Sequence, residues 1–211
     1  MNNIKIALFD VDKTLIHGDS MFYFLIYSIK KKPYLALYLP ILFIKLLAYK
    51  AKIIDTVKAK ESMFYALNYL NEDDLKEFYN KIIKPNIYKD ALSEIKKLKN
   101  NGYYILLISA SPECYLKYFK DEDFIDNLIG TKLKFVNNRF TNKIIGFNCK
   151  GKEKVSRIKK FLEQNKLKID KKNSVAYSDS LSDIPMFNLV NKAYLINSKN
   201  LNTTYEILKW K

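Results

Sequence analysis

The sequence predicts an α/β protein with a mainly parallel sheet and an inserted, all-helical cap. Short apolar runs that indicate strands alternate with helical patterns through most of the 211 residues. This alternation is typical of βαβ units and parallel sheets. One long stretch, residues 19–85, interrupts it and contains no convincing strand. We therefore predict a core formed by residues 1–18 plus 86–211 and a helical cap formed by residues 19–85.

The predicted strands are short and apolar, as expected for strands buried inside a sheet. Residues 103–108 are the clearest case, because Tyr-Tyr-Ile-Leu-Leu-Ile carries no charge. The other expected strands lie at 4–9, near 129–135 and 139–146 across Asn137-Asn138, at 174–177 and at 193–196. Helical patterns separate them at 86–100, 112–120, 151–165 and 183–190.

The predicted cap consists of helices only. Residues 21–29 are apolar and aromatic, and Lys30-Lys31-Lys32-Pro33 breaks that pattern. The stretches 55–70 and 72–83 look amphipathic, which indicates helices with one buried face. Asn71 is a suitable N-cap for the second of them, because the acids that follow it favour a helix start.

Residues 34–49 form an apolar run that contains Pro40 and Lys45. The run is shorter than the ~20 residues that a membrane-spanning helix requires. We interpret it as a buried helix, the commonest meaning of such a run. The alternative is an interfacial helix that meets a membrane or covers a greasy substrate. Basic residues flank the run on both sides, namely Lys30, Lys31, Lys32, Lys50 and Lys52.

Lysine dominates the charge of the chain. There are 37 basic and 22 acidic residues, a formal charge of +15, and Arg139 and Arg157 are the only arginines. Proteins that read nucleic acids favour Arg, whose planar fork matches phosphates and base edges. Because the lysine excess is spread along the whole chain, we predict no nucleic-acid partner. A basic surface would still attract a polyanion or an anionic membrane.

Two cysteines, Cys114 and Cys149, are too few for a disulfide framework, and we expect free thiols in a reducing compartment. The first strand starts almost at the N-terminus, which leaves no room for a signal peptide. These observations predict a cytoplasmic protein. Peripheral contact with a membrane through the cap stays open beside that prediction.

The strongest chemical signal is a pair of aspartates after the first strand. Residues 4–9 run into Asp10 and Asp12, and Thr14 follows two residues later. Ligands usually bind at the carboxyl edge of an α/β sheet, where this strand would end. Two neighbouring carboxylates can hold Mg²⁺, and one of them can attack phosphorus. For this motif alone, an acidic turn without chemistry is the alternative interpretation.

Two other strands also end in polar side chains. Ser109 follows the strand at 103–108, where Ser109 or Ser111 could hold a phosphate oxygen or cap the next helix. Asp179 and Asp183 follow the strand at 174–177. Asp179 could complete a metal site, and Asp183 could orient a lysine.

Lysines crowd the start of the helix predicted at 151–165. A cation is disfavoured at a helix N-terminus unless it faces a bound anion. Lys150, Lys152 and Lys154 compete for that role. At least one of them must belong to a solvated basic turn.

In chain order, these features resemble the haloacid dehalogenase superfamily of phosphohydrolases: D-x-D-x-T after a strand, Ser after a buried strand, Lys at a helix start and D-x-x-x-D after another strand. The position of the helical insertion is similar to the phosphoserine-phosphatase-like branch, with its Rossmann-like core and C1-type cap. The runs around Ser109, Lys154 and Asp179 resemble a subgroup that includes a bacterial phosphatidylglycerophosphatase. The resemblance covers about residues 1–18 and 86–200, and the cap matches only in position and helical character.

The resemblance implies roles for the first two aspartates and for a metal. Asp10 would be the nucleophile that forms an aspartyl-phosphate. Asp12 would protonate the leaving group and then activate water. Mg²⁺ would bind Asp10, Asp179 and the backbone carbonyl of Asp12.

It also implies roles for the surrounding polar residues. Ser109 would hold the phosphoryl group. Lys154 would be the active-site cation, with Lys152 as the second choice, and Asp183 would position that lysine. Three further residues would support the site or contact substrate, namely Thr14, Asp19 and Ser111.

The sequence therefore predicts a Mg²⁺-dependent phosphatase whose substrate lies between core and cap. A lipid phosphate such as phosphatidylglycerophosphate and a small soluble phosphomonoester are equally open as substrates. Ser182 stands where phosphoserine enzymes usually carry Asn, and the Ser-Gly-Gly run after the second strand is missing, which disfavours phosphoserine itself. A module without catalysis that binds a membrane or a polyanion is the alternative from another class.

Overall fold

The computed structural model describes residues 2–200 and 203–211, and its centre is a six-stranded sheet in the order β10-β9-β8-β2-β3-β4. All neighbouring strands in this sheet are parallel. The predicted α/β fold with a mainly parallel sheet is thereby confirmed. The strands are β2 (Ile6–Phe9), β3 (Tyr104–Pro112), β4 (Asn127–Thr131), β8 (Val175–Ser178), β9 (Lys192–Ile196) and β10 (Glu206–Leu208).

Two smaller sheets lie beside the main one. The strand predicted at 4–9 is divided, because β1 (Asn2–Ile4) leaves the main sheet and pairs with β7 (Leu167–Ile169). The hairpin predicted across Asn137-Asn138 is present, between β5 (Leu133–Val136) and β6 (Arg139–Ile144). Both Asn residues have positive φ, at 50° and 59°, which suits a two-residue hairpin turn.

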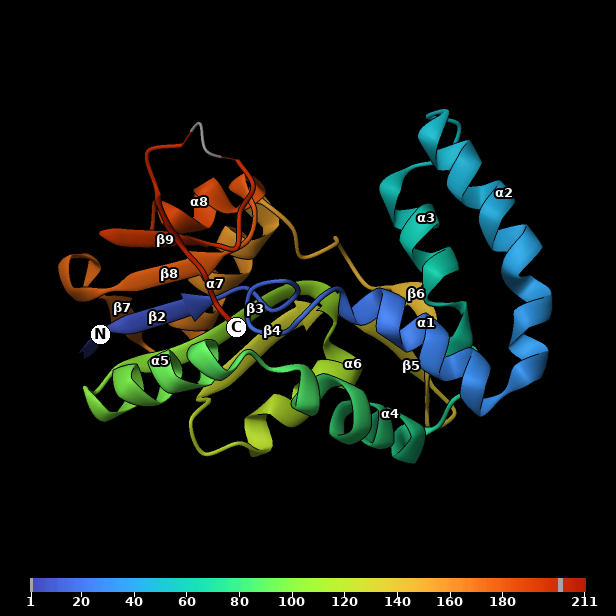
Figure 1. The fold of residues 1–211 in the computed structure, drawn as a ribbon, viewed down its shortest axis with the longest axis horizontal. Helices are drawn as coiled ribbons and strands as arrows, with labels where there is room; N and C mark the ends of the chain where they lie inside the picture. Colours follow the sequence, from blue (N-terminus) through green and yellow to red (C-terminus); the bar gives the residue numbers. More distant parts are fainter. Residues whose placement is uncertain (1, 201–202) are drawn as a thin grey trace.

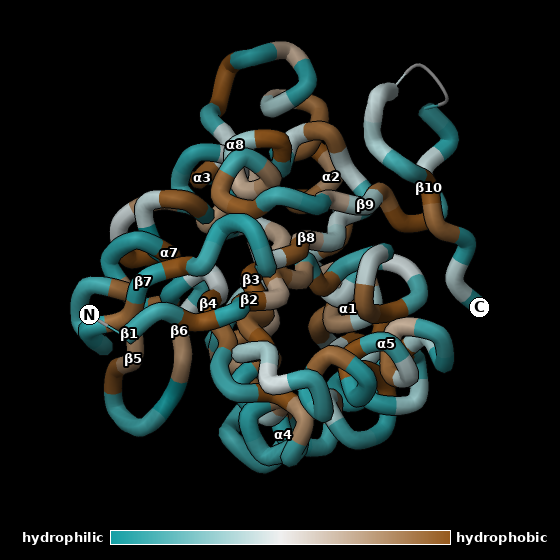
Figure 2. The backbone as a smooth tube through the Cα atoms, turned by 90° about the vertical axis from the view of Figure 1, so that its left-hand side faces the viewer, coloured by the Kyte–Doolittle hydropathy of each residue, from teal (hydrophilic) through white to brown (hydrophobic). Residues whose placement is uncertain are grey.

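Helices cover both faces of the main sheet. The helices of the core are α5 (Lys89–Asn100), α6 (Glu113–Leu116), α7 (Lys152–Gln164) and α8 (Ile184–Phe187). Along β2 the side chains alternate between faces, so that Ala7 and Phe9 join the cluster beneath α5 while Ile6 and Leu8 join the one beneath α7 and α8. Figure 2 shows these strands as hydrophobic segments at the centre of hydrophilic loops.

Residues 19–85 are helical, and none of them lies in a strand. The α-helices are α1 (Ser20–Lys31), α2 (Leu39–Lys50), α3 (Thr56–Met63) and α4 (Glu72–Phe78). Short 3₁₀ and π segments at Pro33–Tyr38, Tyr65–Asn68, Tyr79–Ile83 and Lys84–Asn86 connect them. Asn71 caps α4 through a capping box with Asp74, as its sequence position predicts.

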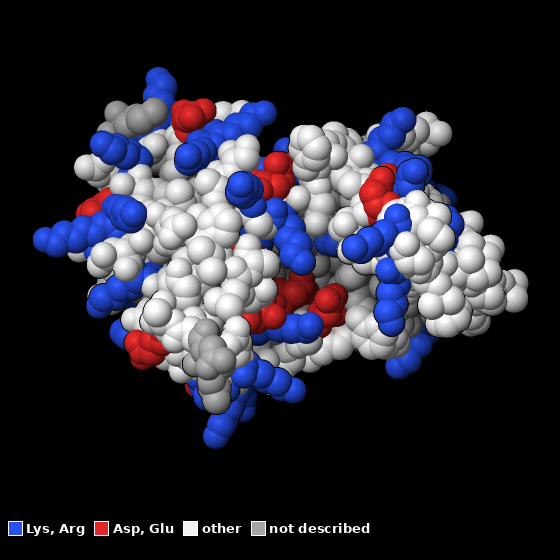
Figure 3. Space-filling model, turned by 90° about the horizontal axis from the view of Figure 1, so that it is seen from above, with Lys and Arg blue, Asp and Glu red and all other residues white. Residues whose placement is uncertain are grey.

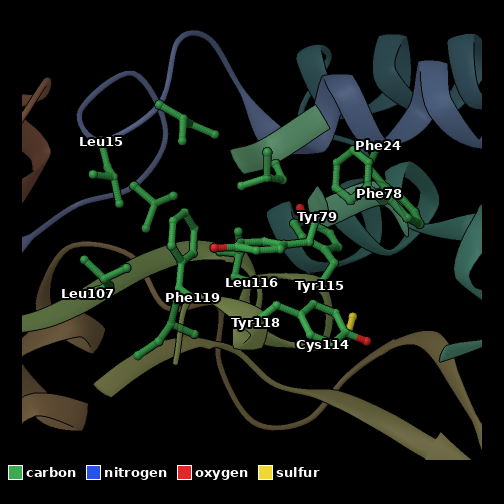
Figure 4. Close-up of a cluster of buried hydrophobic side chains, with 14 of the residues drawn as sticks. Leu15, Phe24, Phe78, Tyr79, Leu107, Cys114, Tyr115, Leu116, Tyr118 and Phe119 are labelled. Atoms are coloured by element: carbon green, nitrogen blue, oxygen red, sulfur yellow. The ribbon is translucent and has the colours of Figure 1, made fainter. Parts of the chain in front are cut away.

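The helices of this insertion divide into two groups. α1 and α4 pack on the core through an aromatic cluster, where the Phe24 ring lies 5.2 Å from the rings of both Phe78 and Tyr115 (Figure 4). α2 and α3 form an arm that stands beside the sheet and projects from the molecule (Figure 1). We call α2, α3 and the 3₁₀ segment Pro33–Tyr38 the arm.

The prediction that residues 34–49 form a buried helix is wrong. Only 11% of the helical stretch Pro33–Lys50 is buried, although its length and composition would allow it to cross a membrane. The physical reason is that α2 packs on α3 through one narrow side that includes Leu42, and no described element covers its opposite side. The apolar run therefore forms a surface.

Candidate active site

The ends of three parallel strands meet at one pocket of about 550 Å³ between the core and the arm. Parallel strands bring their carboxyl ends to the same edge of a sheet, which explains why residues distant in sequence converge here. The pocket is lined from the core by Asp10, Asp12, Lys154, Asp179 and Asp183, among others. Figure 3 shows the acidic side chains at the bottom of the hollow between the two parts of the molecule.

Lys154 lies between two aspartates at the centre of the site. Its Nζ donates to Asp10 Oδ1 at 2.6 Å and to Asp183 Oδ2 at 2.6 Å. Only 2% of Lys154 is exposed. Burial alone would lower the pKa of Lys154, but the Asp10 and Asp183 carboxylates outweigh it and hold the pKa above its usual value. Lys152, the second candidate from the sequence, is exposed to solvent.

Asp10 follows the last residue of β2, and its backbone N–H donates to Tyr177 O at 2.9 Å in the neighbouring strand. Its second oxygen, Oδ2, accepts from Thr14 Oγ1 at 3.2 Å. Together with Lys154, Thr14 fixes the rotation of the carboxylate at the pocket wall. Burial raises the pKa of Asp10 to about 7, against the opposing influence of Lys154. A further cation in the pocket would favour the ionised form of the Asp10 carboxyl group.

Asp12 accepts hydrogen bonds from three directions. Its Oδ1 receives the backbone N–H of Ser20, at the start of α1, at 2.6 Å. Its Oδ2 receives Ser111 Oγ at 2.6 Å and Ser109 Oγ at 3.3 Å. The apolar run predicts a strand that ends before Ser109, but β3 continues to Pro112. Alternate residues of a strand face the same way, so both serine hydroxyls reach Asp12.

The segment after β8 supplies the third side of the site. Ser178 Oγ donates to Asp183 Oδ2 at 2.7 Å, and this bond orients the carboxylate that holds Lys154. The backbone N–H of Asp179 donates to Thr14 Oγ1 at 2.8 Å, which ties this segment to the loop after β2. Burial raises the pKa of Asp179, while Lys13 opposes the rise.

The oxygen donors of this pocket fit a Mg²⁺ ion. Mg²⁺ prefers oxygen ligands and usually binds through one or two carboxylates together with water and substrate phosphate. The Asp179 carboxylate lines the pocket without a hydrogen bond or ion pair to any described residue. No group of three His, Cys, Asp or Glu side chains in the ranges 2–200 and 203–211 could hold a metal. The predicted ligand set would need only two such side chains, those of Asp10 and Asp179, because its third ligand is the backbone carbonyl of Asp12, and it stays a prediction.

The arm contributes a cation that the sequence did not single out. Lys60, on α3, donates from Nζ to Ala110 O at 2.9 Å and to Asn148 Oδ1 at 2.9 Å. These contacts bridge the arm and the core across the pocket that both line. Burial lowers the pKa of Lys60 to about 8, although Asp12 and Asp19 oppose the shift. Lys60 is one of many lysines in the chain, so only its place in the fold distinguishes it.

The structure brings all the predicted site residues to this pocket or its wall. Asp19 lies at the entrance to α1, where its carboxylate caps the helix by accepting from the N–H groups of Met21 and Phe22. Asp19 therefore has a structural function that accounts for its position. Ser109 and Ser111 use their hydroxyls on Asp12, so contact with a phosphoryl group would require those bonds to rearrange.

Comparison with known proteins agrees with this geometry. The sequence model of the haloacid dehalogenase-like hydrolase family matches residues 7–188. Among curated proteins, the chain is 29% identical over 122 residues to phosphoserine phosphatase SerB1 of Mycobacterium tuberculosis. That segment is 57% of this chain but 39% of the relative, so the chain spans well under half of the relative's length.

Solved structures share the fold at low sequence identity. A crystal structure of a protein with unknown function from Bordetella pertussis Tohama I has a TM-score of 0.84 at 20% identity, covering 98% of this chain and 99% of that one. A substrate-bound phosphoserine phosphatase has a TM-score of 0.69 at 17% identity, with 98% and 94% covered. The match extends over both the core and the helical insertion.

Proposed function

The chain belongs to the haloacid dehalogenase-like hydrolase family, and we propose that it is a Mg²⁺-dependent phosphatase that hydrolyses a phosphomonoester through Asp10. The observation that carries the proposal is the buried Asp10–Lys154–Asp183 group at the end of a central strand. Burying a lysine between two carboxylates carries a desolvation penalty, so such a group is weak evidence for stability alone and points to a role in the reaction. The similarity to named phosphoserine phosphatases supports a phosphomonoester as the substrate.

The first step forms a covalent intermediate. An Asp10 oxygen attacks phosphorus, the bond between phosphorus and the leaving oxygen breaks, and Asp12 donates a proton to that oxygen. Lys154 offsets negative charge next to Asp10 while the phosphoryl group transfers. Ser109 and Ser111 are close enough to Asp12 to exchange that hydrogen bond for one to a phosphoryl oxygen.

The second step releases inorganic phosphate. Asp12, now ionised, takes a proton from water, the water oxygen attacks phosphorus, and the bond to Asp10 breaks. The hydrogen bonds that Asp12 accepts from Ser20, Ser109 and Ser111 hold its carboxylate in place for this step. Bound Mg²⁺ would supply charge stabilisation at the phosphoryl oxygens, held by Asp10, Asp179 and the Asp12 carbonyl.

For the substrate we propose a phosphomonoester with an apolar group, of which a lipid phosphate is the leading case. The arm lines the pocket with apolar side chains, whereas a small polar metabolite would be recognised by polar groups. The side chains of the arm that do so are Leu46, Tyr49, Ala59 and Met63, and Met21 of α1 lines the pocket beside them. A small soluble phosphomonoester is the second candidate, favoured by the cation Lys60. Hydrolysis of short-chain but not long-chain lipid phosphates would argue against a lipid substrate.

We place the reaction in the cytoplasm, as the sequence predicts. Cys114 and Cys149 are both free and buried, which suits a reducing compartment. Burial also raises the pKa of both thiols, so neither resembles a reactive cysteine.

The proposal is tested by hydrolysis of p-nitrophenyl phosphate with and without Mg²⁺. We expect wild-type turnover that requires the metal and falls on the order of a thousandfold or more in Asp10→Asn. Asp73→Asn is the matched control, because Asp73 is an exposed aspartate on α4, away from the pocket. Full turnover in Asp10→Asn would refute Asp10 as the nucleophile. No wild-type turnover, combined with no trapping of beryllium fluoride at Asp10, would favour the binding module.

A further inference from the structure

We propose that the outer side of the arm docks on an anionic lipid bilayer, with α2 lying in the plane of the membrane surface. The surface consists of the side chains that α2 and the preceding 3₁₀ segment turn away from the protein: Leu37, Leu39, Ile41, Phe43, Ile44 and Leu47. Phe43 and Ile44 are 62% and 64% exposed. We call these six side chains the outer apolar face.

The outer apolar face is unusual for a surface exposed only to water. Single exposed apolar residues are ordinary, but a contiguous group of large ones marks an interaction site. On α2 the positions of Phe43, Ile44 and Leu47 follow one another around the outward side without an intervening charge. Figure 3 shows the outer end of the arm as a broad uncharged area with basic side chains at its border.

The positive charge around the outer apolar face indicates an anionic partner. From Ser20 to Ile54 the chain contains six lysines and no Asp or Glu. Of these six, only Lys31 has a carboxylate partner among the described residues, and Lys30, Lys32, Lys45, Lys50 and Lys52 have none. A second copy of the chain would bring like charges together around the same face. An anionic bilayer offers both the hydrocarbon for the apolar side chains and the negative charge for the lysines.

Tyrosines border the same surface. Tyr34, Tyr38, Tyr65 and Tyr69 line a groove of about 250 Å³ beside Leu37 and Ile41. Tyr has an apolar ring and a polar tip, which suits the boundary between headgroups and acyl chains. This groove and the outer apolar face are continuous, because they share Leu37 and Ile41.

The packing of the arm favours a helix on the membrane rather than one across it. Leu35 and Leu42 are buried in the hydrophobic core cluster, and the Tyr38 ring stacks on Tyr65 at 4.2 Å. Tyr65 OH also donates to Leu35 O at 2.7 Å. These contacts hold one side of the helix against protein, whereas a lone spanning helix would expose every side to lipid.

Docking would place the active site next to the lipid surface. Leu46 and Tyr49, on the inner side of α2, line the pocket that contains Asp10. The pocket wall and the outer apolar face therefore lie one helix diameter apart, about 10 Å. For the lipid-phosphate substrate this part of the inference rests on the proposed function, but docking itself does not require turnover.

The test is sedimentation of the full chain with lipid vesicles, read without any substrate. Vesicles of phosphatidylcholine alone are compared with vesicles of equal parts phosphatidylcholine and phosphatidylglycerol. We expect binding to the anionic vesicles that weakens with added salt. The double variant Phe43→Glu/Ile44→Glu should bind at least about tenfold more weakly. Ile145→Glu is the control, since Ile145 is an apolar residue, 53% exposed, on the loop after β6.

Each result of this test decides the proposal. An unchanged melting temperature in the double variant shows that lost binding does not come from unfolding, and unaltered binding by Ile145→Glu completes the support. Wild-type protein that stays unbound, or binds neutral vesicles equally well, overturns the proposal. Light scattering without vesicles adds one outcome: a wild-type dimer that Phe43→Glu/Ile44→Glu separates would identify a second copy as the partner instead. Because no turnover is measured, failure of docking leaves the proposed function standing.

Discussion

The active-site edge of the core buries charged side chains, whereas the arm exposes apolar ones. At the core, charged groups are buried and nearly every one has a named partner, as in the Asp10–Lys154–Asp183 group. On the arm, large apolar groups such as Phe43 and Ile44, which are 62% and 64% exposed, face outward. The comparison indicates that the core is organised for chemistry, which needs fixed polar geometry, while the arm is organised for contact with something outside the chain.

The largest effect should come from breaking the core side of this comparison at Lys154. Lys154→Met leaves Asp10 and Asp183 as buried charges without a counterion. We expect a loss of about 3–5 kcal/mol in the free energy of unfolding and at least about a hundredfold loss of turnover. Lys152→Met, two residues earlier on the same helix and exposed, is the matched control. Urea denaturation measures the unfolding free energy, and aryl phosphate hydrolysis measures turnover. Equal effects in Lys154→Met and Lys152→Met would contradict Lys154 as the active-site cation.

Phe24 of the interior and Phe43 of the arm should contribute very differently to the free energy of unfolding. Phe24 is fully buried against Phe78 and Tyr115, so Phe24→Ala should cost about 3–5 kcal/mol of unfolding free energy. Phe43→Ala should stay within about 0.5 kcal/mol, because most of that ring is already in water. Thermal and chemical denaturation test the difference. A large loss in Phe43→Ala would mean that the outer apolar face is covered by protein.

A smaller effect is expected where the two regions meet, at Lys60. We propose that Lys60 also contacts the substrate phosphoryl group, so Lys60→Gln should raise KM for a phosphomonoester about tenfold with little change in kcat. The pKa of Lys60 is lowered by burial to about 8. Wild-type KM should therefore rise as the pH rises through about 8, and Lys60→Gln should lose that dependence. A pH profile that is identical in the two proteins would remove Lys60 from the binding site.

The same pKa also predicts how stability changes with pH. The ordinary pKa of Lys is 10.5, so between about 8 and 10.5 the unfolded chain binds more protons at Lys60 than the folded protein does. This contribution to stability therefore grows as the pH rises through that window. Comparing the unfolding free energies of wild type and Lys60→Gln across these pH values isolates it. A difference that stays constant would show that the lysine is not perturbed by burial.

The sequence predicted the fold, and it predicted which strand ends meet at one edge of the sheet, because both follow from local patterns. An apolar run that ends in polar residues indicates the end of a strand, and parallel strands bring such ends together. This logic placed Asp10, Ser109 and Asp179 at one edge without further information. Very short strands such as β7 and β10 were missed, since three residues carry no periodic signal.

The arm could not be predicted in the same way. An apolar helix has the same composition whether it is covered by protein or by lipid, so composition alone favours the interior for residues 34–49. What decides exposure is the number of layers around the helix, and that is a property of the tertiary structure. Lys60 was missed for a related reason, because its contacts with Ala110 and Asn148 join positions far apart in the chain.

We propose that Asp10 carries the phosphoryl group during turnover, and the most direct test is to find the phosphoryl group on this residue. Wild-type protein would be mixed with an acyl or aryl phosphate and Mg²⁺, quenched in acid, digested and examined by mass spectrometry. We expect one added phosphoryl group on the peptide that contains Asp10 in the wild type and none on that peptide in Asp10→Asn. A phosphoryl group on another residue, or turnover with none trapped and full activity in Asp10→Asn, would contradict it.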